Sequence, residues 1–440
     1  MLQTFKNAWN VPELRKKILF TMMIILLYRI GATLTIPYVD VNQFDSEGAA
    51  LLGAGMFEFM GMLSGSAFSM ATIFALSVSP YITASIVMQL LTIAIPPLER
   101  MSKDENGKKK IAAATRWVTV GLALITAYGY VNMLNMSGLI LKVKDVNEVF
   151  IWAVMIGSLC AGASLIMWLA EKINDYGIGN GISMILFANI LSSGTQSVMD
   201  LYNMVRLDGA AMQAWGYVLG AAKVLLSLAV ALGAVILVVW FTNSERRIKV
   251  IYAKRVVGRK MYGGQKTNLP LKMNMAGVMP VIFASSIVSI PATIAAFFPA
   301  KNPFRLWVEE WLSQISPIYI ILFIVLIFAF SYFYIAISFN PVEVANNIRS
   351  NGGSIVGIRP QEMAGFIKKR LNRVTLMGAV FLVIIAATPM IVNAILTVCN
   401  VTFTSVAFAG TSLLIVVGVA LETVRDLEAQ LAMRNFEGFL

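Results

Sequence analysis

The chain has 440 residues, of which 58% are hydrophobic and only 13% are charged, and its mean hydropathy is +0.75. This composition excludes a water-soluble fold with one core and a charged surface, and it is typical of a protein with several membrane spans. The formal net charge is +12, histidine is absent and there are two cysteines, so neither a disulfide framework nor a cysteine–histidine metal site is indicated.

Ten apolar stretches are each long enough to cross a bilayer as a helix of about 20 residues. They fall at 18–37, 70–95, 111–134, 149–171, 181–204, 216–241, 274–299, 316–339, 374–396 and 406–424. The first follows a polar, basic stretch and has no small-residue cleavage site after it, so we expect it to be retained and not removed as a signal peptide. The sequence therefore predicts an all-α membrane protein with ten transmembrane helices.

Lysine and arginine are concentrated on one side of this predicted topology. Together with both termini, the alternate connections 96–110, 172–180, 242–273 and 340–373 hold 27 of the 35 basic residues. The positive-inside rule assigns this side to the cytoplasm, so both termini are expected to be cytoplasmic. We interpret the net charge as a signal of topology and not of nucleic-acid binding.

A short segment precedes the second predicted span. Residues 56–69, MFEFMGMLSGSAFS, are apolar and interrupted by glycine, and they are too few to cross a bilayer. The span that follows, FALSVSPYITASIVMQLL, has no charge but includes Ser79, Thr83 and Gln89. Polar groups in hydrocarbon are costly unless they face protein or water. The two segments together indicate a half-crossing element followed by a helix that lines a pathway.

Five spans precede an outer connection at 206–215 and five follow it. An odd number of spans in each half, 1–205 and 216–440, gives the halves opposite orientations, as in inverted-repeat membrane proteins. Two long cytoplasmic segments belong to the second half. In 242–273, basic and apolar residues alternate, which predicts a β-ribbon, and 340–373 combines turn residues with the basic run KKRLNR. Exposed segments of this kind are common docking sites.

Patterns for nucleotide binding are weak. GGQKT at 263–267 lacks the long glycine-flanked loop of a P-loop, and GIGNGIS at 177–183 has no βαβ context. A tight turn into the fifth span is the better explanation of the second string. The sequence therefore gives no support to an ATP or dinucleotide site.

Charges within the predicted spans are few. The basic residues among them are Arg29, Arg116 and Lys223, and no carboxylate is expected at mid-depth. We expect Arg116 and Lys223 to snorkel from span ends and Arg29 to pair with backbone carbonyls or a neighbouring span. Ion-coupled transporters usually need buried carboxylates, so a secondary transporter or lipid flippase is the less favoured alternative. A purely structural scaffold does not explain the polar-cored span.

Aliphatic side chains recur at helical spacing beside polar ones. Val78 and Ile82 share one face of the second span, and Ile182 and Leu186 share one face of the fifth. From the spacing alone, ordinary helix packing is the simpler explanation. The polar neighbours favour a pore with a hydrophobic collar, which stops ions by dewetting while the flanking cavities stay hydrated.

Specific strings occur in order along nearly the whole chain: FALSVSPYITASIVMQLLT, GIGNGISMILFANI, RRIKVIYAKR, LPLKMNMAGVMPVIFASSI with PATIA, NPVEVANNIRSNGGSIVGIRP and GTSLLIVVGV. They resemble the bacterial SecY family, the pore subunit of the Sec protein-translocation channel. The resemblance implies two five-span halves that form a clamshell around an hourglass pore, with a short plug helix. It also implies a protein-conducting channel that is not an enzyme and needs no cofactor.

The resemblance implies four groups of site residues. The pore ring corresponds to Val78, Ile82, Ile182, Leu186, Ile282 and Ile415. The plug, within 56–69, corresponds to Met56, Phe57, Gly61, Met62, Leu63, Ser64, Gly65 and Ser66. The polar cluster of a lateral gate between spans 2–3 and 7–8 corresponds to Thr83, Gln89, Asn180 and Ser285. Docking residues for the motor and the ribosome correspond to Arg246, Arg247, Lys254, Arg255, Arg259 and Arg359.

The implied partners are SecE and SecG subunits, the SecA ATPase, the ribosome, signal sequences, nascent polypeptides and membrane lipid. No nucleotide would bind to this chain directly. The implied location is the bacterial cytoplasmic membrane, where unfolded secretory polypeptides would cross and membrane segments would leave sideways. Two positions depart from the family pattern: Val78 is smaller than the isoleucine common there, and Gln361 follows GIRP in place of glycine. The outer loops at 138–147, 300–315 and 397–405 match poorly.

Overall fold

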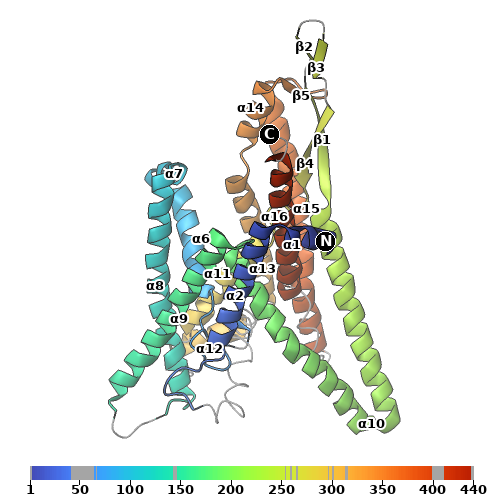
Figure 1. The fold of residues 1–440 in the computed structure, drawn as a ribbon. Helices are drawn as coiled ribbons and strands as arrows, with labels where there is room; N and C mark the ends of the chain where they lie inside the picture. Colours follow the sequence, from blue (N-terminus) through green and yellow to red (C-terminus); the bar gives the residue numbers. More distant parts are fainter. Residues whose placement is uncertain are drawn as a thin grey trace.

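The protein is a bundle of long helices from which a narrow ribbon of strands projects (Figure 1). The structure is a computed structural model, and it describes residues 2–40, 64–65, 67–141, 146–252, 254–257, 260–263, 266–295, 297–299, 302–312, 316–398 and 411–437.

The helices of the first half begin close to the predicted spans. They are α1 (Leu2–Asn10), α2 (Pro12–Gly31), α6 (Ser79–Ala94), α7 (Pro96–Lys103), α8 (Glu105–Met136) and α9 (Glu148–Tyr176). Proline lies in the first turn of α2, α6 and α7, where its missing N–H costs no helical hydrogen bond.

The second predicted span is helical over a shorter stretch than expected. Residues 70–78 form turns, and both Ala71 and Ser77 have positive φ angles. Helix α6 ends before Pro96, and Ile95 has the extended backbone that a following proline favours. The next helix, α7, departs at 106°. The polar residues in the middle of the predicted span therefore lie near the start of α6.

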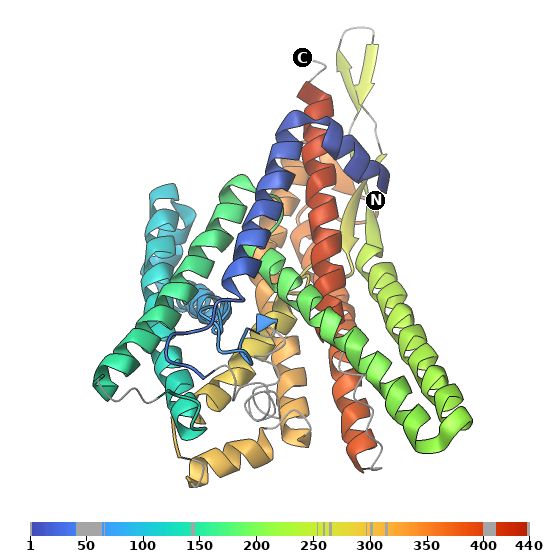
Figure 2. The same cartoon turned by 60° about the horizontal axis from the view of Figure 1, so that its bottom comes forward.

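The fifth and sixth predicted spans form one helical element, α10 (Gly181–Asn243), whose chain reverses direction partway along (Figures 1 and 2). The connection expected at 206–215 has helical backbone. Its sequence, RLDGAAMQAW, contains no proline and is rich in residues of high helix propensity, which explains why helical structure continues into the turn.

The second half continues with helices that pack side by side. They are α11 (Met279–Ala295), α12 (Pro303–Trp311), α13 (Pro317–Ser338), α14 (Pro341–Ser350), α15 (Met363–Val398) and α16 (Thr411–Glu437). Helix α13 packs between α11 and α15, and α16 packs against α10.

The basic β-ribbon predicted for 242–273 is confirmed. Its strands are β1 (Glu245–Tyr252), β2 (Lys254–Val257), β3 (Lys260–Gly263) and β4 (Lys266–Lys272), with β1 antiparallel to β4 and β2 antiparallel to β3. A short strand from the other cytoplasmic segment, β5 (Gly353–Ile355), pairs with β1, so the sheet order is β4-β1-β5. The fold is therefore mostly helical with a small sheet, which corrects the all-α class.

Both chain ends lie on the same side of the bundle. Helix α1 packs against α16, and Ala8 shares a small buried cluster with Leu427. The strands, α14 and the C-terminus lie toward the upper end in Figure 1, opposite α12 and the turn of α10. This arrangement agrees with a topology in which both termini and the basic segments share one membrane face.

Four helical stretches among the described residues are long and apolar enough to cross a membrane, and the bent pair α6–α7 would make a fifth. The four are Glu105–Met136, Glu148–Tyr176, Pro317–Ser350 and Met363–Thr388. Shorter apolar stretches lie in α10 and α11. The structure thus supports a protein with several membrane-spanning helices, and the count of ten stays a prediction.

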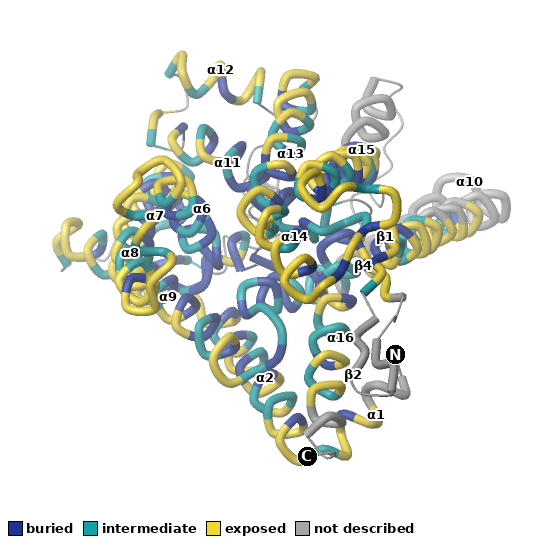
Figure 3. Tube along the Cα trace, turned by 90° about the horizontal axis from the view of Figure 1, so that it is seen from above, coloured by how far each residue is buried: buried dark blue, intermediate teal, exposed yellow. Residues whose placement is uncertain are grey.

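The largest buried cluster joins the two halves. It includes residues of α2, α6, α9 and α10 together with residues of α11, α13, α15 and α16. Buried positions accordingly gather in the middle of the bundle when it is seen from above (Figure 3). A second cluster, between α8, α9 and residues 36–39 and 68–76, belongs to the first half alone.

Candidate functional site

The six residues predicted for the pore ring, here called the aliphatic ring, lie in one hydrophobic cluster. Five of them are between 1% and 2% exposed: Val78, Ile82, Leu186, Ile282 and Ile415. The sixth, Ile182, is partly buried and packs against the same cluster. The structure therefore brings together side chains from the start of α6 and from α10, α11 and α16.

Local backbone structure explains how two members of the ring face the same way. The amide of Ile82 donates to the carbonyl oxygen of Val78 at 3.0 Å, so the two residues are one helical turn apart although Val78 lies just before α6. Ile282 bonds in the same way to Val278, at 3.2 Å, where α11 begins. A closed ring of branched aliphatic side chains offers no group to hydrate an ion, so it can act as a dewetted barrier.

The predicted plug segment, 56–69, is described only at its C-terminal end. Met56, Phe57, Gly61, Met62, Leu63 and Ser66 lie outside the described residues. Ser64 is fully buried, and its hydroxyl accepts a hydrogen bond from the amide of Phe68 at 3.0 Å. Gly65 has a φ of +61°, and a Cβ added there would lie 2.7 Å from the backbone oxygen of Asn189 on α10. Only glycine fits both conditions.

The C-terminal end of the plug segment and the residues just after it form hydrogen bonds with neighbouring segments. The hydroxyl of Tyr130, on α8, donates to the carbonyl oxygen of Phe68 at 2.6 Å, and the two rings pack with centroids 4.8 Å apart. The amide of Ile36 donates to the carbonyl oxygen of Ala71 at 2.9 Å, and the amide of Ile73 donates to the carbonyl oxygen of Leu34 at 2.9 Å. The C-terminal end of the plug segment is therefore joined to α8 and to the chain that leaves α2.

A buried polar group beside the plug segment was not among the predicted site residues. Asn189 is 0% exposed; its amide nitrogen donates to the hydroxyl of Ser77 at 3.2 Å, and its amide oxygen accepts from the guanidinium of Arg29 at 3.5 Å. The expected pairing of Arg29 with a neighbouring span is thus confirmed. The sequence signal for Asn189 was its place in the otherwise apolar string ILFANIL.

The four residues predicted for a lateral-gate cluster bond locally. Thr83 donates to the carbonyl of Ser79 at 3.1 Å, and Ser285 donates to that of Ile282 at 2.8 Å. The amide of Gln89 donates to the hydroxyl of Ser85 at 3.3 Å. Asn180 caps α10 by accepting from the backbone amides of residues 182 and 183. Within the described part of the chain, their hydrogen bonds join each residue to its own helix and not to the other three.

The predicted docking residues lie on or next to the sheet. Arg246 and Arg247 are exposed on β1, and the guanidinium of Arg247 pairs with the carboxylate of Glu245 at 2.6 Å. Arg359 is exposed beyond β5. Lys254 and Arg255 belong to β2, where only the backbone is described, and Arg259 lies outside the described residues.

The two predicted docking segments form one unit, which sequence reasoning did not foresee. Strand β5 pairs with β1, and a buried cluster joins the sheet to α14 and the start of α15 through residues such as Val250, Leu271, Ile348 and Ile367. We call this unit, formed by β1, β4, β5, α14 and the start of α15, the cytoplasmic platform. At its base, burial together with nearby Arg425 lowers the pKa of Lys272.

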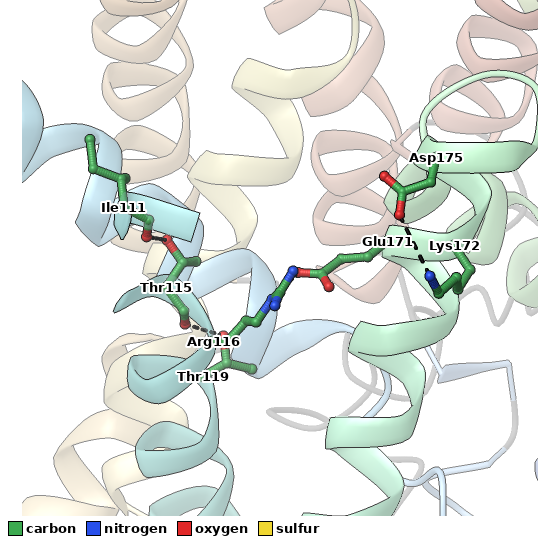
Figure 4. Close-up of polar contacts among 7 residues, drawn as sticks. All are labelled: Ile111, Thr115, Arg116, Thr119, Glu171, Lys172 and Asp175. Carbon is green, nitrogen blue, oxygen red and sulfur yellow. Dashed lines mark hydrogen bonds and ion pairs between the residues drawn. The ribbon is translucent and has the colours of Figure 1, made fainter. Parts of the chain in front are cut away.

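An ion pair links two helices of the first half (Figure 4). The Nε atom of Arg116, on α8, lies 2.8 Å from a carboxylate oxygen of Glu171 on α9. Arg116 was expected to snorkel from a span end; its side chain is 54% exposed, and the ion pair adds a specific partner that the sequence did not predict. Near it, Lys172 lies 3.8 Å from the carboxylate of Asp175, one turn further along α9. The side chain of Lys223 is not among those described.

No group of three or more histidine, cysteine, aspartate or glutamate residues that could hold a metal ion occurs among the described residues. The described residues thus contain a buried aliphatic cluster, a close approach of Gly65 to the backbone of Asn189, and a sheet unit that carries exposed arginines.

Known proteins are similar to this chain along nearly its whole length. A family model described as SecY matches residues 72–424. The protein translocase subunit SecY of Streptomyces galbus is 42% identical over 456 aligned positions that cover 100% of both chains. The one from Thermus thermophilus is 38% identical and covers 100% of this chain and 98% of the relative.

Solved structures share the fold at low sequence identity. One described as the structure of a protein conducting channel matches with a TM-score of 0.64 at 17% identity, over 94% of this chain and 92% of that one. Canine Sec61 in a ribosome–channel complex matches with a TM-score of 0.60 at 16% identity, over the same shares. Because the family model covers most of the chain and relatives above 30% identity span all of it, this chain belongs to the SecY family.

Proposed function

We propose that the chain is the channel subunit of a protein translocase, through which unfolded polypeptides cross a membrane. The main observation in support is that the six residues proposed for the aliphatic ring, which come from both halves, lie in or pack against one buried cluster. An unfolded polypeptide presents polar and apolar side chains of every size, so its conduit cannot depend on specific contacts. Branched aliphatic side chains yield around such a chain and close behind it.

In this proposal the ring and the plug segment seal the resting channel together. Each fully buried aliphatic side chain contributes about 2 kcal/mol through burial, which favours the closed ring. The plug segment, 56–69, would fill the outer funnel, with its end held by Tyr130 and close to Asn189. We place it within a clamshell of two five-span halves that hinge where α10 reverses near 206–215.

We further propose that segments of membrane proteins leave sideways between α6 and α8 on one side and α11 and α13 on the other. Thr83, Gln89 and Ser285 already bond within their own helices. Parting the helices therefore leaves these polar groups satisfied, so the main cost of opening is lost apolar contact. An apolar signal sequence offsets that cost by burying its own surface, at roughly 25 cal/mol per Å².

The cytoplasmic platform is the proposed dock for partners that drive transport, the SecA ATPase and the ribosome. Its exposed arginines suit an acidic protein surface or the phosphates of ribosomal RNA. SecE and SecG subunits would complete the channel in the bacterial cytoplasmic membrane, with both termini in the cytoplasm. The chain itself would bind no nucleotide.

The decisive experiment replaces two ring residues. The double variant Ile82→Gly and Ile182→Gly removes two of the six side chains of the barrier, so the resting channel should conduct ions in planar bilayers. A matched control is Val87→Gly with Leu191→Gly. It introduces the same loss of helix propensity at exposed positions of the same two helices. Conductance no higher than that of the control would exclude the ring. Solute-dependent currents from the unmodified chain would instead favour a secondary transporter.

A further inference from the structure

A groove lies where α13, α14 and the start of α15 meet, away from the aliphatic ring. Its volume is about 520 Å³, within the range of ordinary ligand sites. Its walls are mostly apolar and include Ile335 of α13, Phe339 just after α13, Val342 of α14 and Leu371 of α15. The small side chains of Ala336, Ala364 and Gly365 leave the space between these helices open.

The groove has a single charged lining residue, Lys368. Its side chain is exposed, and it forms no ion pair within the described part of the chain. The neighbouring Arg370 stacks its guanidinium over the ring of Phe366 instead, 5.0 Å from the ring centre. The ammonium group of Lys368 is therefore available to an anion at the mouth of an apolar groove.

The groove lies where α13 ends and α15 begins, within two candidate membrane spans. Pro317–Ser350 contains α13 and α14, and Met363–Thr388 contains the first part of α15, and both are apolar enough to cross a bilayer. Leu376 and Met377, about two turns along α15 from Lys368, are exposed apolar residues. With these stretches in a membrane, one end of the groove would adjoin the hydrocarbon layer, and Lys368 would stand near the lipid headgroups.

The two hydroxyl groups in the lining already donate hydrogen bonds to the backbone. The hydroxyl of Tyr332 donates to the backbone oxygen of Asn372 at 3.5 Å, and that of Thr375 donates to the backbone oxygen of Leu371 at 2.9 Å. A bound peptide would need partners for its backbone, and this lining offers few. A long apolar chain with one negative charge at its end has the matching chemistry.

We propose that the groove binds one anionic phospholipid, with its phosphate at Lys368 and an acyl chain along the apolar walls. Basic pockets between membrane helices on the cytoplasmic side suit such headgroups, and lysine can keep its charge at the interface while its stem packs on apolar surface. The occupied groove would brace α14 and α15, and hence the cytoplasmic platform, against the membrane surface. This role is separate from conduction through the ring.

The test uses the full chain in vesicles that contain a photoreactive phosphatidylglycerol or a photoreactive phosphatidylcholine. After illumination, labelled positions are mapped by mass spectrometry. The anionic probe should label α13 and α15 at the groove, and Lys368→Gln should lower that labelling about fivefold, the size expected for one basic group at a membrane surface. Lys369→Gln, which removes an equal charge outside the lining, should leave it unchanged.

A second variant keeps the test decisive. Ala336→Trp fills the groove from an exposed position and should remove labelling there by the anionic probe while Lys368 remains. Equal labelling of the groove by both probes, or labelling that Lys368→Gln does not reduce, would overturn the proposal. A partner peptide crosslinked in the groove in place of lipid would overturn it as well.

Discussion

Gly65 and Asn189 determine how closely the plug segment approaches the wall of the channel. Gly65 lies against the backbone of α10 in a left-handed conformation, and the side chain of Asn189 is held by Ser77 and Arg29. A flexible side chain could move away from an added Cβ, but a helical backbone cannot do so without shifting α10. In the proposed closed state, this contact would therefore set the distance between the plug segment and α10.

Replacing Gly65 with alanine should make the resting channel leak. The substitution strains a positive φ, which costs about 1–2 kcal/mol, and it places a methyl group 2.7 Å from the backbone oxygen of Asn189. We expect the fraction of open time in planar bilayers to rise roughly tenfold. Gly157→Ala is the control, because a Cβ there meets nothing within 4 Å. A Gly65→Ala channel as silent as the control would show that the segment is not seated through this residue.

At the residue scale, the sequence was informative where a role depends on side-chain type and spacing. Helical spacing placed Val78 with Ile82 and Ile182 with Leu186 on shared faces, and their polar neighbours favoured a pore collar over ordinary packing. The family resemblance supplied Ile282 and Ile415. The bond between Arg29 and Asn189 joins residues 160 positions apart, so no local pattern could reveal it. A buried asparagine in an apolar string indicates that a partner exists without identifying it.

At the scale of elements, α8 and α9 are joined by more than apolar packing. The ion pair between Arg116 and Glu171 lies between them, with the glutamate side chain 20% exposed and the arginine 54% exposed. Both helices also contribute to the cluster that surrounds the end of the plug segment. The pair therefore fixes the relative position of two helices that hold the plug segment in place.

Removing this pair should loosen the first half. Glu171→Gln leaves Arg116 without its carboxylate partner, and we expect the free energy of unfolding in detergent to fall by about 1 kcal/mol, as for a partly exposed pair. The swapped variant Arg116→Glu with Glu171→Arg should recover part of that loss. Lys172→Gln, whose ion pair with Asp175 is longer and lies within α9, serves as the control. A swap no more stable than the single variant would contradict a specific ion pair.

Which elements could be predicted depended on how local their causes are. The β-ribbon was foreseen because alternation of basic and apolar residues is a local signal that the antiparallel pairing of β1 and β4 satisfies. The late start of α6 was not foreseen. Residues 70–78 have the hydropathy of a membrane span, but they form turns because their backbone bonds to the chain that follows α2. The helical backbone at 206–215 was also missed, since span counting assumes a loop between two helices.

At the scale of the whole molecule, the cytoplasmic platform connects the proposed docking residues to the channel walls. Strand β1 begins directly after α10, and the sheet is buried against the start of α15. Helices α10 and α15 also contribute residues to the cluster that contains the proposed aliphatic ring. A partner that moves the platform therefore acts on the helices around the ring and needs no contact with the ring itself.

Reversing the charge of one platform residue separates docking from folding. Arg359 is exposed and follows β5, so Arg359→Glu should leave the sheet, the bundle and membrane insertion of the chain intact while it repels an acidic or phosphate-rich partner surface. In reconstituted vesicles we expect binding of the SecA ATPase and ATP-driven export to fall at least tenfold. Arg100→Glu on α7 is the matched control, because it makes the same reversal at an exposed arginine outside the platform. Normal motor binding and export by the Arg359→Glu channel would refute its docking role and leave the proposed aliphatic ring unaffected, because the ring residues are buried inside the bundle and Arg359 is on its surface.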